Sequence, residues 1–342
     1  CSGAFHTVTG PDISSTGAFE IQYTSTAVTV RISRLPSFVL TTSTPTPVAG
    51  VPLDLTVQAV DVNNNPDPTY VGSVLFSSAD SAAELPLPYT FTAADLGQKS
   101  FPGGLTMRTA GPMLVRGISG ENTLMRGSVV LNVSASAVNA DVSTINAAPN
   151  SLEANGVAQS TITVTPKDDF GNNVGAGHTV AITTTLGTLV GAVVDVGNGT
   201  YTQQLQAGLT PGNANVRATV DGVLLSTQRL VQLRQDTTAP GPVVLSAAAV
   251  GSSVVNLAWT PSGSPDVVGH LATRWDTTTA QPAVDVGNGT TAPVTGLTAC
   301  TSYGFTVSPR DAAGNLAPAS NRVDVRTHLD GDPEAATGLT AK

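Results

Sequence analysis

The feature that most constrains the fold of this chain is a strict alternation of apolar and other side chains in short runs that end in turn residues. The clearest run covers residues 53–60, and Asp-Val-Asn-Asn-Asn-Pro at 61–66 ends it. Because successive side chains of a strand point to opposite faces, this run is a half-buried strand. No apolar stripe of helical spacing extends over three turns, and only 93–96 is expected to form one helical turn. The chain is therefore predicted to be all-β.

The length predicts several small domains rather than one core. Single domains cluster near about 100–150 residues, so 342 residues form two to four of them. Thr and Val favour strands, while 34 Gly and 23 Pro supply the turns. We expect tandem β-sandwiches in an elongated row. The predicted segments are 1–35, 36–137, 138–234, 235–328 and 329–342, of which the first and last are partial.

Three runs characterise the first complete segment. They are Ala-Gly-Val-Pro-Leu-Asp-Leu-Thr-Val-Gln-Ala-Val-Asp at 49–61, Tyr-Val-Gly-Ser-Val-Leu-Phe at 70–76 and Tyr-Thr-Phe-Thr-Ala-Ala-Asp at 89–95. With them, the segment resembles a bacterial immunoglobulin-like domain frequent in large surface proteins. Its further strands are predicted at 71–77, 98–106, 113–118 and 127–133.

The second segment repeats the order of strands and turns. A strand at 160–165 is followed by the turn Asp-Asp-Phe-Gly-Asn-Asn at 168–173. Further strands are predicted at 180–184, 199–205 and 214–220. In this order the segment resembles the invasin/intimin-type immunoglobulin-like module over its whole length.

The third segment combines Val-Val-Asn-Leu-Ala-Trp at 254–259 with Leu-Thr-Ala-Cys-Thr-Ser-Tyr at 297–303. It is similar to a fibronectin type III domain. The resemblance implies that Trp259 lies in the core. It also implies that Tyr303 forms a tyrosine corner, in which the hydroxyl bonds to nearby backbone. Cys300 departs from the family pattern and places a thiol without an evident partner in the corner loop.

Both ends of the chain look cut from a longer array. Residues 17–23 and 27–33 look like the last two strands of another sandwich, and 332–341 resembles the first strand of a further fibronectin module. Cys1-Ser-Gly also resembles the start of a mature bacterial lipoprotein, so lipidation of Cys1 stays open.

Charge and cysteine content limit the classes of binding partner and of structural site that the chain can have. A net charge of −9, with only 15 scattered basic residues, argues against nucleic acid. Two cysteines, Cys1 and Cys300, are too few for a disulfide scaffold or a Cys-based zinc site. The most apolar stretch, 241–259, is interrupted by Ser, Gly and Asn, so no transmembrane segment is predicted. We expect contacts with neighbouring domains or identical chains, and a glycan or cell-surface ligand stays open.

One sequence resembles a calcium loop. Asp-Val-Asn-Asn-Asn at 61–65 matches the opening of an EF-hand, but Pro66 and Gly72 stand where that loop requires Gly and Glu. The EF-hand interpretation therefore fails. An interdomain calcium site that uses Asp61, Asp67 or Asp168 stays open beside the alternative of ordinary Asx turns.

No residue is assigned a catalytic, cofactor-binding or metal-binding role, and no cofactor is expected. The histidines are spread along the chain (His6, His178, His270 and His328), and no known catalytic motif is present. Trp259 and Trp275 leave a sugar-binding face open, with Trp259 favoured as core. Asp-Val-Gly-Asn-Gly-Thr at 195–200 and 285–290 predicts tight hairpins with type I′ turns.

These features favour a non-enzymatic structural or adhesive segment of a secreted bacterial cell-surface protein that forms a stalk, fibre or filament. Sandwich arrays suit distance and cohesion better than chemistry. Two alternatives stay open. The modules could be spacers or carbohydrate-binding modules of a secreted polysaccharide-degrading enzyme, or components of a phage or injection-system fibre. The expected location is extracellular, at the bacterial surface.

Overall fold

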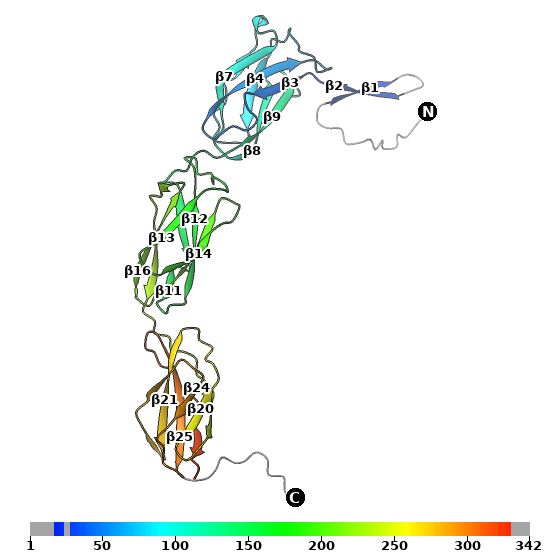
Figure 1. The fold of residues 1–342 in the computed structure, drawn as a ribbon. Coiled ribbons are helices and arrows are strands. Elements are labelled where there is room, and N and C mark those ends of the chain that lie inside the picture. The colour runs from blue at the N-terminus through cyan, green and yellow to red at the C-terminus, as the bar shows by residue number, and fades with distance from the viewer. Residues whose placement is uncertain (1–16, 24–27, 330–342) are drawn as a thin grey trace. The chain divides into compact units, whose positions relative to one another are not determined.

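The computed structural model describes residues 17–23 and 28–329, and it contains strands almost throughout (Figure 1). The all-β prediction is confirmed. The single helical element of the described residues is one 3-10 turn, η1 (Ala93–Asp95), where a helical turn was expected. No helix in the described part of the chain is long and apolar enough to span a bilayer.

The strands group into three sandwiches, preceded by a hairpin. Strands β1 (Gly17–Tyr23) and β2 (Val28–Arg34) pair antiparallel, as expected for the two N-terminal runs. That they complete another sandwich stays a prediction. The expected strand at 332–341 lies outside the described residues. The strands of the sandwiches fall within 37–133, 144–234 and 245–326, and the predicted domain boundaries stay a proposal.

The first sandwich packs a three-stranded sheet, β3-β4-β7, against a four-stranded sheet, β6-β5-β8-β9. Its core is aromatic, with Phe38, Phe91 and Tyr70 in mutual contact. The alternation at 53–60 is borne out, because its apolar side chains are buried. The bounds are β3 (Ser37–Thr42), β4 (Pro52–Val60), β5 (Ser73–Ser78), β6 (Tyr89–Thr90), β7 (Gln98–Thr106), β8 (Gly111–Ser119) and β9 (Arg126–Val133).

The second sandwich combines the sheets β10-β12-β15-β14 and β11-β18-β16-β13, and β17 joins β16. Its buried side chains are mostly aliphatic, with Ile162, Leu205 and Val231 fully buried beside Tyr201. The bounds are β10 (Thr144–Ala148), β11 (Ser151–Glu153), β12 (Gln159–Thr165), β13 (Val180–Thr184), β14 (Thr188–Asp195), β15 (Tyr201–Gln206), β16 (Gly212–Val220), β17 (Val223–Leu224) and β18 (Arg229–Arg234).

The third sandwich combines the sheets β19-β20-β24 and β22-β21-β25-β26, and β23 joins β21. Trp259 is 5% exposed and lies in the core, as the resemblance implied. The tyrosine corner is also present, because the Thr298 amide donates to the Tyr303 hydroxyl at 2.9 Å. The bounds are β19 (Leu245–Ala249), β20 (Val255–Trp259), β21 (Val267–Asp276), β22 (Thr279–Ala280), β23 (Val284–Gly287), β24 (Thr291–Val294), β25 (Ser302–Asp311) and β26 (Val323–Arg326).

The prediction of two type I′ hairpins is wrong. The copy at 195–200 does connect neighbouring strands, but the copy at 285–290 joins β23 to β24 in another sheet. The asparagine of neither copy has the positive φ that a type I′ turn needs; Gly197, Gly199 and Gly287 have it instead. The reason is the leading aspartate, whose Oδ1 accepts the amide N–H two residues later at 2.8 Å in both copies.

Candidate functional site

A five-residue loop of the form Asp-x-x-x-Asn recurs once in each sandwich, at 61–65, 168–172 and 311–315. In all three, the Asp amide donates to the Asn carbonyl oxygen, at 2.8, 3.0 and 3.2 Å respectively. The Asn amide donates back to Asp Oδ1, at 2.9, 2.9 and 2.8 Å. The Asn side-chain amide donates to Asp Oδ2, at 3.3, 2.9 and 2.8 Å. One carboxylate therefore closes the whole loop.

The fourth residue of each loop explains the sequence pattern. Asn64, Gly171 and Gly314 all have positive φ, at 66°, 83° and 91°. Glycine and asparagine are the residues that adopt this left-handed conformation at least cost. The loops are rigid turns set by sequence, so they can hold their outer atoms in place for a neighbouring segment.

The loop of the second sandwich contacts the first sandwich through Asn172. Its side-chain amide donates to the carbonyl oxygen of Arg108 at 2.8 Å, and its Oδ1 accepts from the amide of Ala110 at 2.9 Å. Arg108 and Ala110 belong to the connection between β7 and β8. A paired donor and acceptor of this kind fixes both the spacing and the orientation of the two backbones.

Asp168 in the same loop holds the linker that precedes its sandwich, residues 134–143 between β9 and β10. Its Oδ2 accepts from the Ser136 amide at 3.0 Å, and its Oδ1 from the Phe170 amide at 3.0 Å. Burial alone raises the pKa of Asp168. The hydrogen bonds from Asn172, Ser136 and Phe170 outweigh that effect, and the pKa lies below its usual value. The buried carboxylate is thus charged and well satisfied.

An aromatic contact completes this junction. The ring of Phe170 lies so close to Gly50 that a Cβ there would come within 2.6 Å of it. The guanidinium of Arg108 lies over the same ring, 5.9 Å from its centroid. Glycine at position 50 is therefore required both by its positive φ of 80° and by the ring.

The loop of the third sandwich contacts the linker that precedes this sandwich, residues 235–244 between β18 and β19. The Asn315 side-chain amide donates to the Asp236 carbonyl oxygen at 3.2 Å. The linker also returns to the second sandwich, since the Thr238 hydroxyl donates to Glu153 Oε1 at 2.9 Å. Asn315 thus binds a linker backbone, where Asn172 binds a neighbouring sandwich.

The three aspartates considered for calcium serve as turn residues. Asp61 accepts backbone N–H groups from Asn63 and Asn65, and Asp67 accepts the amide and hydroxyl of Thr69. Asp168 is used by its loop and linker as described above. These bonds support the Asx-turn interpretation at all three positions.

Three other aspartates, which sequence reasoning missed, come together beside the 311–315 loop. One carboxylate oxygen each of Asp236, Asp266 and Asp311 lies within 4.8 Å of the other two. They come from the linker, the turn before β21 and the end of β25. The repetition of the Asp168 loop at Asp311 was the available signal, but no local motif joins the three.

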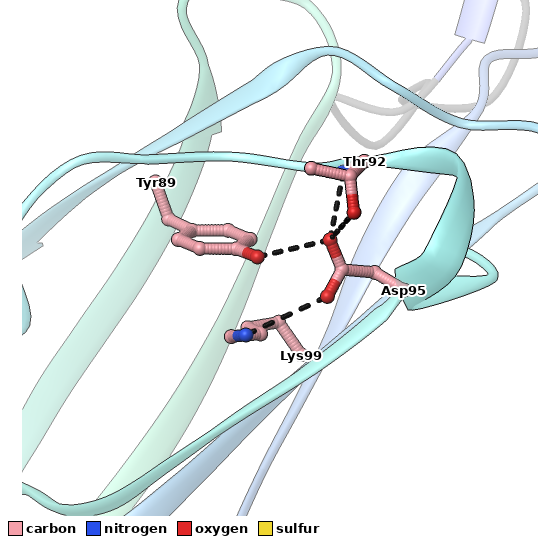
Figure 2. Close-up of polar contacts among 4 residues, drawn as sticks. All are labelled: Tyr89, Thr92, Asp95 and Lys99. Carbon is pink, nitrogen blue, oxygen red and sulfur yellow. Dashed lines mark hydrogen bonds and ion pairs between the residues drawn. The ribbon is translucent and has the colours of Figure 1, made fainter.

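The run at 89–95, one of the three that characterise the first segment, forms a polar cluster around Asp95 together with Lys99 (Figure 2). Asp95 Oδ2 accepts from the Thr92 hydroxyl and amide, both at 2.7 Å, and from the Tyr89 hydroxyl at 2.9 Å. Lys99 lies 3.5 Å from Oδ1 and 4.5 Å from the centre of the Tyr89 ring. The Thr92 hydrogen bonds, with Tyr89 and Lys99, lower the pKa of Asp95 to about 2. A carboxylate held ionised in this way is a structural anchor for η1 and is a poor general acid.

The remaining candidates lie apart. His178 contacts the Val174 carbonyl oxygen, whereas His270 is buried against Trp259 with a ring separation of 5.1 Å. His328 closes the end of the third sandwich through its amide, and His6 lies outside the described residues. Cys300 is an exposed free thiol beside Arg326, with a 2.9 Å contact.

Trp275 does not present an open platform for a sugar. Its ring lies under the guanidinium of Arg322, 5.3 Å from the centroid, and its indole N–H donates to the Thr306 hydroxyl at 3.4 Å. A cavity of about 490 Å³ opens between the sheets of the third sandwich, with Phe305 and Val294 in its wall. Its one aromatic lining residue, Phe305, is fully buried, so the cavity offers no open aromatic face to a sugar.

Comparison with known proteins assigns the second sandwich. Residues 139–236 match the family model of Invasin, domain 3. This segment is similar to that family along its whole length. The resemblance predicted for 138–234 is therefore confirmed, and the tandem arrangement of immunoglobulin-like domains before a fibronectin type III domain holds.

Curated relatives come from another class of protein. The chain is 37% identical over 154 residues to Chitinase A1 of Niallia circulans, covering 45% of this chain and 20% of that protein. It is 44% identical over 84 residues to Chitinase D of the same organism, covering 24% and 15%. It is 30% identical over 155 residues to Exoglucanase B of Cellulomonas fimi, covering 41% and 14%. The chain spans at most a fifth of the length of these relatives.

Similar solved structures include bacterial adhesins. The Escherichia coli adhesin FdeC aligns with a TM-score of 0.48 at 18% identity, covering 87% of this chain and 99% of that one. InvD of Yersinia pseudotuberculosis aligns with a TM-score of 0.42 at 20% identity, covering 86% and 98%.

Proposed function

We propose that this chain is a non-catalytic structural segment of a secreted bacterial surface protein, in which it acts as a stalk or fibre element that carries an adhesive end. The observation that carries the proposal is the recurring Asp-x-x-x-Asn loop. In two sandwiches it is hydrogen-bonded to the preceding sandwich or linker, through Asn172 and Asn315. Junctions closed by specific side-chain bonds make neighbouring domains stiff, which a spacer that transmits distance or force requires.

The match of 139–236 to Invasin, domain 3, supports an adhesive setting. The proposed partners are neighbouring domains and identical chains. Strand β14 offers an edge for such pairing. It ends its sheet, its one charged residue is the terminal Asp195, and it exposes Val190 and Val194 by 40% and 58%. Exposed edges with little charge favour strand addition.

Electron microscopy of native material, released from cells or medium without trimming, tests this function. Rods that end in a distinct head, or a filament with a regular axial repeat, are the expected results. Filaments would further identify the chain as a building block that pairs with itself. Compact particles without any rod would contradict a structural role.

A second candidate is a spacer of a secreted polysaccharide-degrading enzyme, which the partial matches to chitinases and an exoglucanase favour. Co-sedimentation of the chain with insoluble chitin and cellulose tests whether these modules bind such a substrate. Depletion from the supernatant would support this candidate. No depletion, together with a parent protein that lacks hydrolase activity, would exclude it.

A further inference from the structure

The three aspartates beside the 311–315 loop form an acidic pocket, defined here as Asp236, Asp266 and Asp311. Their nearest carboxylate oxygens lie within 4.8 Å of one another. Asp236 is 3% exposed and Asp311 1% exposed, whereas Asp266 is half-buried. Three carboxylates at this separation repel one another strongly, because burial removes the water that would screen them.

The hydrogen bonds of the pocket leave one buried oxygen without a partner. Asp311 is satisfied, since both of its oxygens accept from Asn315. Asp236 Oδ1 accepts the Thr238 amide at 3.0 Å, but Asp236 Oδ2 is buried and has no hydrogen-bond donor. A buried carboxylate oxygen without a donor is costly, so the site calls for a further positive group.

The electrostatics of the pocket point the same way. Burial raises the pKa of Asp236, and the charges of Asp311, Glu153 and Asp266 raise it further. Arginine and lysine do not offset this charge: the ion pairs found in the described part of the chain lie at other positions. A cation bound among these carboxylates would relieve the repulsion.

We propose that Asp236, Asp266 and Asp311 bind a calcium ion that fastens the linker to the third sandwich. All the donor atoms are oxygens, the ligands that calcium prefers, whereas protein zinc sites usually include His or Cys. Calcium–oxygen distances are about 2.3–2.6 Å, so two oxygens on opposite sides of one ion lie about 5 Å apart. Oxygens within 4.8 Å of one another fit a single ion. Water would complete the coordination on the side of the half-exposed Asp266.

The site would act on the junction because its ligands come from both parts. Asp236 belongs to the linker, and its carbonyl oxygen already accepts from Asn315. Asp266 and Asp311 belong to the third sandwich. Calcium binding would thus lock the linker in place. The inference draws on the proposed function only for the calcium-rich surroundings of an extracellular protein, and the binding itself can be tested in isolation.

Isothermal titration of the full 342-residue chain, stripped of metal with a chelator, with calcium chloride tests the site. We expect one ion per chain and a Kd of about 0.1–1 mM, the range of extracellular modules. Asp236→Asn and Asp266→Asn should each weaken binding by about tenfold or more. Asp324→Asn, an exposed carboxylate of the same sandwich that pairs with Arg322, is the matched control and should bind like the parent.

Thermal unfolding gives a second test, because the stability difference between the Asp236→Asn variant and the parent should reverse when calcium is added. Without calcium, Asp236→Asn should be at least as stable as the parent, because it removes a buried charge that lacks a partner. With saturating calcium, the parent should gain stability and the variant should not. If Asp236→Asn does not fold, the half-exposed Asp266→Asn carries the same test. No calcium uptake by the parent, or equal loss in Asp324→Asn, would overturn the proposal. Electron microscopy of the native rods is independent of either result.

Discussion

The loops at 168–172 and 311–315 have the same internal hydrogen bonds but meet different neighbours. At Asp168 the linker supplies an amide N–H, from Ser136, and the carboxylate is fully satisfied. At Asp311 the linker supplies another carboxylate, Asp236, whose Oδ2 has no donor. The same loop geometry thus occurs at two different junctions. The junction at Asp168 is closed by hydrogen bonds alone, whereas the junction at Asp311 brings several carboxylates together. The difference lies in the residues around the loop, Asp236 of the linker and Asp266 before β21, rather than in the loop itself.

The largest effect is expected from Asp168→Ala. This change leaves the part-buried amide groups of Ser136, Phe170 and Asn172 without the buried carboxylate that accepts from them, and should destabilise the second sandwich by about 3 kcal/mol. Hydrogen exchange measured by mass spectrometry reports each sandwich separately. Peptides from β12 and β16 should exchange about a hundredfold faster.

The matched control for this change is Asp61→Ala. It removes the same carboxylate from the loop of the first sandwich, where the surrounding residues are largely exposed. Water can replace its bonds, so we expect a loss of about 1 kcal/mol. Equal losses for the two variants would show that the linker bond at Ser136 contributes nothing.

Local patterns in the sequence predicted the strands, core positions and turns that depend on residues close together along the chain. Alternation predicted β4, and family spacing predicted the places of Trp259 and Tyr303. The turns at Asp61 and Asp168 were predicted because an aspartate captures backbone amides a few residues away. The predicted type I′ turn at 285–290 is wrong for a local reason as well, because Asp285 accepts the Gly287 amide N–H and holds the loop in another turn.

The acidic pocket was beyond such reasoning. Asp236, Asp266 and Asp311 come from three separate segments, and only the packing of β21 against β25 and the course of the linker bring them together. Sequence reasoning considered Asp61, Asp67 and Asp168 instead, because they stand in polar runs. A polar run shows that a turn is present, but it does not show whether the carboxylate has spare oxygens.

Asn172→Ala sharpens the comparison between the junctions. It removes the bonds to Arg108 and Ala110, at a cost of about 1.5 kcal/mol. The Ala110 amide, which donates to Asn172, should then exchange about tenfold faster. Asn315→Ala should leave the Ala110 amide unchanged. Faster exchange in both variants would mean that the two loops do not act on separate junctions.

A smaller effect is expected from Phe170→Ala. The ring is 42% exposed, so its truncation removes only part of the apolar burial of a phenylalanine, together with the contacts to Gly50 and Arg108. A loss of about 1 kcal/mol follows, measurable as a lower melting temperature. Leu87→Ala, at a side chain that is 84% exposed, is the control and should change nothing. If the melting temperature is unchanged in both variants, the Phe170 ring does not contribute to the stability of the junction.

The smallest effect concerns Asp95, a carboxylate satisfied within one sandwich, as Asp168 is at a junction (Figure 2). Its pKa of about 2 in the folded chain lies below the ordinary 3.8. The folded state therefore binds this proton less readily than the unfolded chain. The stability that Asp95 contributes is complete above pH 3.8 and is lost as the pH falls through about 2.

A carbon-detected NMR titration of the carboxyl group measures the shift in the pKa of Asp95. Thr92→Val removes the hydroxyl that contributes most and should raise the pKa of Asp95 towards 3.8, whereas Thr90→Val, at an exposed position on β6, should not. An equal pKa in both variants would mean that the Thr92 hydroxyl does not hold the carboxylate ionised.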